Sequence, residues 1–176
     1  MSSKVRTIAW RDGVVEILDQ RRLPHAVKYL RLRSARQVAK AIRDMAIRGA
    51  PAIGVAAAMG LALTAYHSKT KNREKLLEKL RESYEVLRAS RPTAVNLFWA
   101  LDRVMRIAES SKDVEEVRGR VVEEALKIME EDIEANKRMG EYGARLIEDG
   151  DRILTHCNAG ALATAGYGTA LGVIRT

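Results

Sequence analysis

The chain has 176 residues, of which 47% are hydrophobic and 31% are charged, and its formal net charge is +8. That length and composition suit one good hydrophobic core, and a single cysteine excludes an internal disulfide. The positive residues are scattered and no aromatic residues are interleaved with them, which argues against nucleic acid as a partner. The polar start, residues 1–4, predicts no secretory leader, so we expect a cytoplasmic protein.

Short β-like runs open the chain. Residues 7–10 and 14–19 flank the pair Asp12-Gly13, and Asp-Gly between two apolar runs is a strong hairpin signal. After Leu23-Pro24 interrupts the pattern, residues 27–32 predict a third strand. The first thirty residues therefore predict a small antiparallel sheet.

Helices are predicted from residue 34 to residue 148. Ser34 and Gln37 have the spacing of a capping box, and we expect the helix that they start to end at Gly49. The uncharged stretch 49–67 is about long enough to span a bilayer, but its many alanines and glycines favour a helix packed inside the protein. Pro51 suits the first turn of that helix. Three more helices follow, each with a polar residue at its start: Asn72, Thr93 and Asp113.

Apolar residues in these helices recur at three- and four-residue intervals, which predicts the faces turned to the core. They are Val38, Ile42 and Met45; Leu76, Leu80 and Leu87; Leu97, Leu101 and Val104; and Val114, Val117, Val121, Ala125 and Ile128.

The turn Asp149-Gly150-Asp151 marks the expected domain boundary. We expect residues 1–149 to form a domain of sheet plus helical bundle, and residues 150–176 to form the first strand and helix of a Rossmann-like α/β domain. The fold class is accordingly α+β to α/β. The strand is predicted over residues 152–156. One strand of a parallel sheet does not fold alone, so we expect either a fragment or a partner chain that completes the sheet.

Cys157 follows this predicted strand directly and precedes the glycine-rich segment 158–172. A reactive residue at a strand end beside a glycine-rich turn is the usual site of an open α/β sheet, whereas a lone cysteine among small residues is often a buried, inert thiol. Both interpretations remain open. His156 would point to the opposite face of a strand, so a His156–Cys157 pair is not expected. The spacing of Gly166, Gly168 and Gly172 does not match the dinucleotide-binding fingerprint.

A candidate anion site lies in the segment Arg48-Gly49-Ala50-Pro51. A guanidinium beside the free N–H groups of a helix N-terminus suits a phosphate, although an ordinary turn with a solvated arginine fits the same spacing. Arg91-Pro92-Thr93 repeats the arrangement. The three histidines are too far apart in sequence to suggest a metal site.

Four segments together resemble the methylthioribose-1-phosphate isomerase family: residues 19–24, 44–54, 90–97 and 155–172. Ribose-1,5-bisphosphate isomerase and the regulatory subunits of translation initiation factor 2B share this family's fold. The Cys157-Asn158-Ala159-Gly160 run and the Arg-Pro-Thr turn favour the methylthioribose branch.

The resemblance implies an aldose–ketose isomerase of methionine salvage, which converts 5-methylthioribose 1-phosphate to 5-methylthioribulose 1-phosphate without a cofactor. It implies that Arg48, Gly49, Ala50 and Arg91 bind the phosphorylated pentose and that Cys157 is catalytic. It also implies that this chain is the N-terminal half of a homodimeric enzyme whose second half supplies a catalytic aspartate, a glutamine and an Asn-Lys pair. The alternative is a non-catalytic regulatory subunit that senses phosphosugars or nucleotides.

Overall fold

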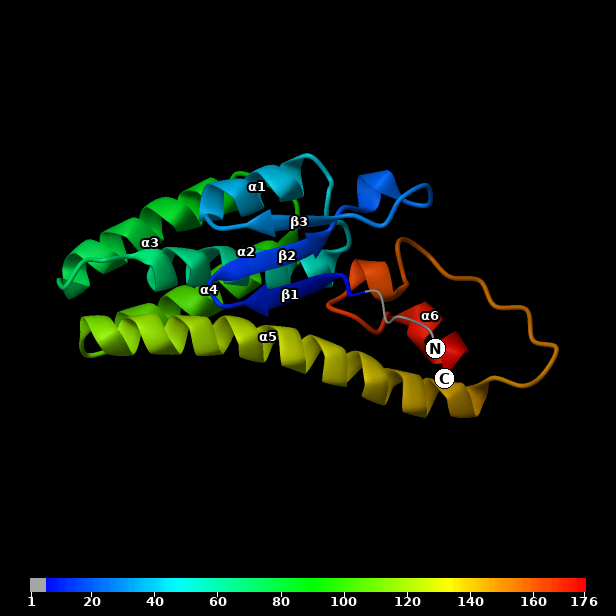
Figure 1. Ribbon diagram of the computed structural model, residues 1–176. Coiled ribbons are helices and arrows are strands. Elements are labelled where there is room, and N and C mark those ends of the chain that lie inside the picture. The colour runs from blue at the N-terminus through cyan, green and yellow to red at the C-terminus, as the bar shows by residue number, and fades with distance from the viewer. Residues whose placement is uncertain (1–5) are drawn as a thin grey trace.

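The computed structural model describes residues 6–176, which form a small sheet beside a helical bundle (Figure 1). The antiparallel strands, in the order β1-β2-β3, are β1 (Ile8–Arg11), β2 (Val14–Leu18) and β3 (Tyr29–Leu32). The helices are α1 (Ala35–Arg43), α2 (Ala50–His67), α3 (Arg73–Arg88), α4 (Val95–Ser110), α5 (Val114–Gly143) and α6 (Ala170–Arg175). Short 3₁₀ turns are η1 (Gln20–Arg22), η2 (Ala144–Leu146) and η3 (Ala161–Ala163). The predicted fold class, a small antiparallel sheet followed by a helical bundle, is confirmed.

The predicted hairpin forms at Asp12-Gly13. Both residues have positive φ, 46° and 76°, as the two central residues of a type I′ turn require. The turn pairs Arg11 with Val14 and sets the register of β1 on β2.

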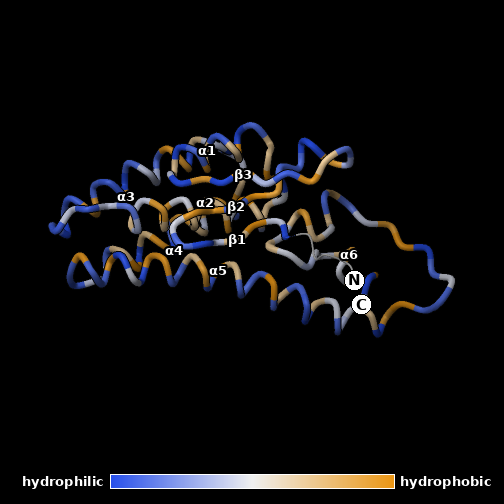
Figure 2. The backbone as a smooth tube through the Cα atoms, viewed as in Figure 1, coloured by the Kyte–Doolittle hydropathy of each residue, from blue (hydrophilic) through white to orange (hydrophobic). Residues whose placement is uncertain are grey.

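Helix α2 is the central element of the bundle, in contact with α1, α3, α4 and α5. Its length and composition would allow it to cross a membrane, but 72% of it is buried inside the protein. Alanines and glycines let the neighbouring helices approach it closely, as the sequence predicts. Figure 2 shows hydrophilic and hydrophobic residues alternating along α3 and α5, which each turn one face to this centre.

The helices around α2 bury their apolar faces as the periodicity predicts. The buried residues include Val38, Ile42, Leu76, Leu80, Leu87, Leu97, Leu101, Val104, Val117, Val121, Ala125 and Ile128. The predicted caps also form at Ser34, Asn72 and Asp113, whose side chains each accept a backbone N–H in the first helical turn.

Two predicted helix boundaries were wrong. Helix α1 ends at Arg43 instead of Gly49, because Met45 takes a left-handed φ of 57° and is 47% exposed, so it is not a core residue. Thr93 does not cap α4: Ala94 holds the cap position without a side-chain bond, and its N–H donates to the carbonyl of Arg91.

The strand predicted over residues 152–156 was also wrong. In Figure 1 the chain after η2 forms a long loop that extends away from the bundle before it returns at η3. A strand is stabilised by ladder hydrogen bonds, and the part of the chain that the structure describes places no other strand beside this segment. Ile153 and Leu154 are therefore left 44% and 98% exposed.

Candidate functional site

The first component of the site is the turn between α1 and α2. Gly49 precedes α2 with φ of 95°, a conformation that favours glycine, and its carbonyl accepts the N–H of Ile53 at 2.9 Å. Pro51 lies in the first turn of α2, as predicted. Arg48 is exposed beside this helix N-terminus, where backbone N–H groups and the positive end of the helix dipole favour an anion.

The glycine-rich segment lies directly on this turn. A Cβ atom on Gly49 would overlap the Cα and carbonyl oxygen of Ala163 in η3. The residue is therefore a glycine for two reasons: its positive φ and its contact with another backbone. Gly49 and Ala50, at the start of α2, are thus adjacent to a segment that lies more than a hundred residues later in the sequence.

Thr164 organises the glycine-rich segment from within. Its hydroxyl oxygen, fully buried, accepts the N–H groups of Gly166, Tyr167 and Gly168 at 3.2, 3.2 and 3.0 Å. Gly168 has φ of 101°, and a Cβ there would lie 2.8 Å from the carbonyl carbon of Gly160. The segment is therefore a compact loop folded on itself.

A carboxylate of α5 holds the loop from the side. Asp132 Oδ2 accepts the N–H of Ala165 at 2.7 Å, and Oδ1 accepts from Asn136 Nδ2 at 3.1 Å. Burial raises the pKa of Asp132, although both hydrogen bonds oppose that effect. Asp132 and Thr164 were missed at the sequence level. Thr164 could have been recognised, because a threonine shortly before a Gly-x-Gly sequence is a turn signal. Asp132 could not, because its sequence context is that of any acidic residue on a solvated helix face.

The raised pKa of Asp132 predicts a pH effect on stability. Above the ordinary carboxyl pKa of about 4, the folded protein retains a proton that the unfolded chain has lost, so the unfolding free energy falls as the pH rises through the raised pKa. Asp132→Asn should remove this decline, as measured by urea unfolding at a series of pH values from about 4 upward. Glu134→Gln, on the exposed face of the same helix, is the matched control and should leave the decline in place. Identical pH profiles for Asp132→Asn and the wild type would contradict the assignment.

Arg91 lies in the turn before α4, and the start of α4 lies beside the start of α2. A Cβ on Gly54, in the second turn of α2, would be 2.9 Å from the carbonyl oxygen of Asn96, in the first turn of α4. The two helices therefore begin side by side. Arg91 is partly buried, whereas Arg48 is exposed. The structure thus brings the two arginine turns and the glycine loop to one end of the bundle.

Cys157 stands apart from this assembly. It is exposed, with a left-handed φ of 65°, and follows the extended loop. The loop becomes anchored two residues later at Ala159, whose carbonyl accepts the N–H groups of Thr169 and Leu171 at 3.0 and 3.2 Å. The alternative of a buried thiol was wrong, because the side chain is exposed. His156 is exposed too, and because the strand is not formed, the argument from alternating faces does not apply to it.

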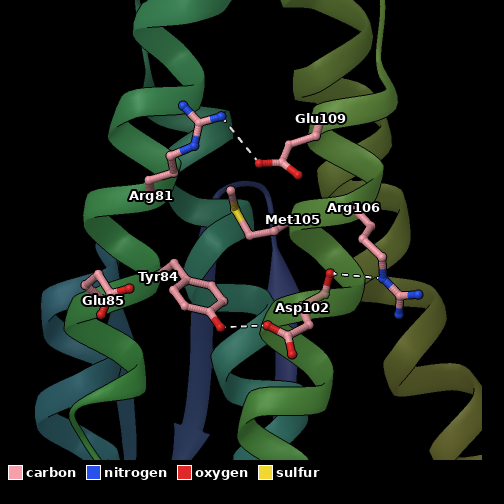
Figure 3. Close-up of a pocket in the computed structure, with 7 residues that line it drawn as sticks. All are labelled: Arg81, Tyr84, Glu85, Asp102, Met105, Arg106 and Glu109. Carbon is pink, nitrogen blue, oxygen red and sulfur yellow. Dashed lines mark hydrogen bonds and ion pairs between the residues drawn. The ribbon is translucent and has the colours of Figure 1, made fainter.

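A separate groove of about 630 Å³ lies between α3 and α4 (Figure 3). Tyr84 donates to Asp102 Oδ1 at 2.6 Å, which raises the pKa of Tyr84 to about 12, and Arg81 pairs with Glu109 at 3.3 Å. None of the candidate site residues lines this groove, and its polar groups largely pair with one another. Within residues 6–176, no three His, Cys, Asp or Glu side chains are grouped so as to hold a metal ion.

Comparison with known proteins places the chain in a family. The sequence profile of the initiation factor 2 subunit family matches residues 46–176, and the chain belongs to that family. It is 49% identical over 175 residues to methylthioribose-1-phosphate isomerase 1 of Pseudothermotoga lettingae, a match that covers 99% of this chain and 51% of the relative. The chain spans about half the length of the curated relatives it matches.

Two solved structures share the fold. The 5-methylthioribose 1-phosphate isomerase of Pyrococcus horikoshii superposes with a TM-score of 0.91 at 48% identity, over 97% of this chain and 48% of that one. The delta subunit of translation initiation factor eIF-2B from A. fulgidus superposes with a TM-score of 0.88 at 46% identity, over 97% and 50% of the two chains. The resemblance to the isomerase family inferred from four sequence segments is confirmed.

Proposed function

We propose that this chain functions in an aldose–ketose isomerase that converts 5-methylthioribose 1-phosphate to 5-methylthioribulose 1-phosphate. The observation that carries the proposal is the contact of Gly49 with Ala163, which joins an arginine-bearing helix N-terminus to the loop that follows Cys157. The proposal is supported by relatives named for this activity, which share about half of their aligned residues with this chain. Because the match covers about half of each relative, we propose that this chain is the N-terminal half of the isomerase and supplies part of its active site.

The substrate's phosphate would bind at the start of α2. Arg48 offers a guanidinium, and Gly49 and Ala50 offer backbone close to the helix N-terminus, an arrangement that favours a phosphate. Arg91 would add a second cation from the turn before α4. The pentose would then extend from this end of the bundle toward the segment that carries Cys157.

Cys157 would move protons in the reaction. A hydrogen passes from C2 to C1, the C2 hydroxyl becomes a ketone, and the ring oxygen takes up a proton as its bond to C1 breaks. A cysteine can give or accept such a proton because a thiol ionises near neutral pH.

The reaction is internally redox-balanced, and we propose that it needs no cofactor. We further propose that the protein is cytoplasmic, in keeping with its single free cysteine, and that the complete enzyme is a homodimer.

A non-catalytic regulatory subunit is the second candidate, favoured by the likeness to the eIF-2B delta subunit. The two functions differ in turnover. The 176-residue chain and the complete product of its gene are incubated with 5-methylthioribose 1-phosphate, and formation of the ketose is followed by NMR. We expect conversion by the complete product. No conversion, together with ligand-dependent binding to a partner factor, would replace the isomerase with the regulatory subunit.

Arg48→Ala and Arg91→Ala should each weaken substrate binding. Loss of a charge-assisted contact costs about 1.5–3 kcal/mol, which corresponds to a rise in the Michaelis constant of about 10- to 150-fold. Arg43→Ala removes the same charge from an exposed position on α1 and controls for the change in net charge. Steady-state kinetics of the isomerase measures the effect. Unchanged Michaelis constants in both site variants would remove the two arginines from the site.

A further inference from the structure

Gln20 connects the two components of the candidate site. It lies in η1, within the 19–24 segment, which has no role so far in the site. Its backbone N–H donates to the carbonyl of Ala46 at 2.9 Å, in the turn that leads to Arg48. Its side-chain Nε2 donates to the carbonyl of Leu162 at 2.7 Å, in η3. Only the amide nitrogen of the side chain can donate to a carbonyl, which fixes the orientation of the amide.

These bonds close a ring of contacts around the site. Leu162 precedes Ala163, whose backbone packs on Gly49, and Gly49 lies three residues after Ala46. The Gln20 side chain therefore acts on the peptide that sets the spacing between the loop and the arginine turn. Without its donor, the Leu162 carbonyl loses this attachment, and η3 keeps the contact with Gly49 and the hydrogen bond from the Thr7 hydroxyl to the Ala161 carbonyl.

The η1 turn is itself held firmly, so that Gln20 has a fixed base. Asp19 is buried, with 3% of the residue exposed. Its carboxylate accepts hydrogen bonds from Arg21 Nε at 2.7 Å and from Arg21 Nη2 at 2.8 Å. These bonds lower the pKa of Asp19. Arg21 also approaches Asp44, just after α1, at 3.8 Å. The turn is thereby attached to the α1–α2 connection at a second point besides Ala46.

We propose that Gln20 is a positioning residue that holds the glycine loop against the Arg48–Gly49 turn and so sets the affinity for the phosphorylated substrate. The kinetic part of this inference rests on the proposed isomerase function, whereas the mechanical link does not. Thr7 and Asp132 bind the same loop, but each attaches it to an element other than the arginine turn.

The test uses two substitutions at Gln20 and one matched control. Gln20→Glu removes the donor, and Gln20→Met removes it without adding charge. Gln37→Glu is the same chemical change at the only other glutamine, and it keeps the acceptor that binds the Arg33 N–H. Hydrogen–deuterium exchange of the 176-residue chain follows the peptide covering residues 159–168. Steady-state kinetics of the isomerase gives the turnover number and the Michaelis constant.

Both Gln20 variants should exchange about tenfold faster in this peptide, the effect expected from one lost hydrogen bond, with α5 unchanged. Their Michaelis constant should rise by a similar factor, while the turnover number changes little. A loss of folded protein would lower the turnover number and leave the Michaelis constant unaltered. Wild-type exchange in both variants would overturn the link whatever the activity, and a normal Michaelis constant would overturn the positioning role. A wild-type enzyme without turnover, with fast exchange in the variants, would refute the isomerase but keep the link.

Discussion

Cys157→Ser should lower the turnover of the isomerase by about two to four orders of magnitude, the usual contribution of a positioned proton-transfer group. A hydroxyl is a far poorer acid or base near neutral pH than a thiol, whose ordinary pKa is about 8.5. The fold should be unaffected, because the Cys157 side chain is exposed and packs in no core. Turnover numbers and thermal unfolding of the two proteins check both statements. A serine enzyme with near-normal turnover would mean that Cys157 takes no part in proton transfer.

The same cysteine provides a second measurement. Cys157 is the only thiol of the chain, so the extent of alkylation by iodoacetamide reports on a single site. The exposed thiol should react readily in the 176-residue chain, with little protection by 5-methylthioribose 1-phosphate. Protection should appear in a complete isomerase if the thiol and the substrate share a pocket. No protection in an enzyme that turns over the substrate would contradict a shared pocket.

Local patterns predicted the elements whose structure depends on neighbours in sequence. The Asp12-Gly13 turn, the caps at Asn72 and Asp113, and the buried faces of α3 to α5 all follow from short-range rules. The strand predicted over residues 152–156 failed for a different reason, because a partner decides whether a strand forms. Residues 152–156 have a strand-like composition, but a strand needs a neighbour, and the described residues contain none beside it.

The same contrast between local and long-range interactions applies to the residues of the candidate site. Arg48 and Gly49 are recognisable in sequence because a glycine and a proline at a helix start have a local meaning. Gln20 is not, because its role is a hydrogen bond to Leu162, 142 residues further along the chain. No spacing rule covers such a distance. The resemblance of the 19–24 segment to the family drew attention to these residues without giving a physical reason for them.

Among single substitutions in the turn between α1 and α2, Gly49→Ala should cause the largest loss of stability. At φ of 95° an alanine is strained by about 1–3 kcal/mol. Its Cβ would also overlap the backbone of Ala163, and overpacking of this kind typically costs a further 1–3 kcal/mol or so. We therefore expect a loss of about 2–4 kcal/mol in unfolding free energy, because the loop can move partly away. Urea unfolding measures it.

Gly119→Ala is the matched control for this substitution. Gly119 is exposed in α5, and a Cβ there would meet nothing within 4 Å. Alanine should stabilise that helix by about 0.5–1 kcal/mol, so the same chemical change should have opposite signs at the two positions. Displacement of η3 by the alanine at position 49 should also speed hydrogen exchange in residues 159–168. A Gly49→Ala protein as stable as the wild type would mean that η3 does not lie on this turn in solution, and the argument that joins Arg48 to the loop after Cys157 would fail with it.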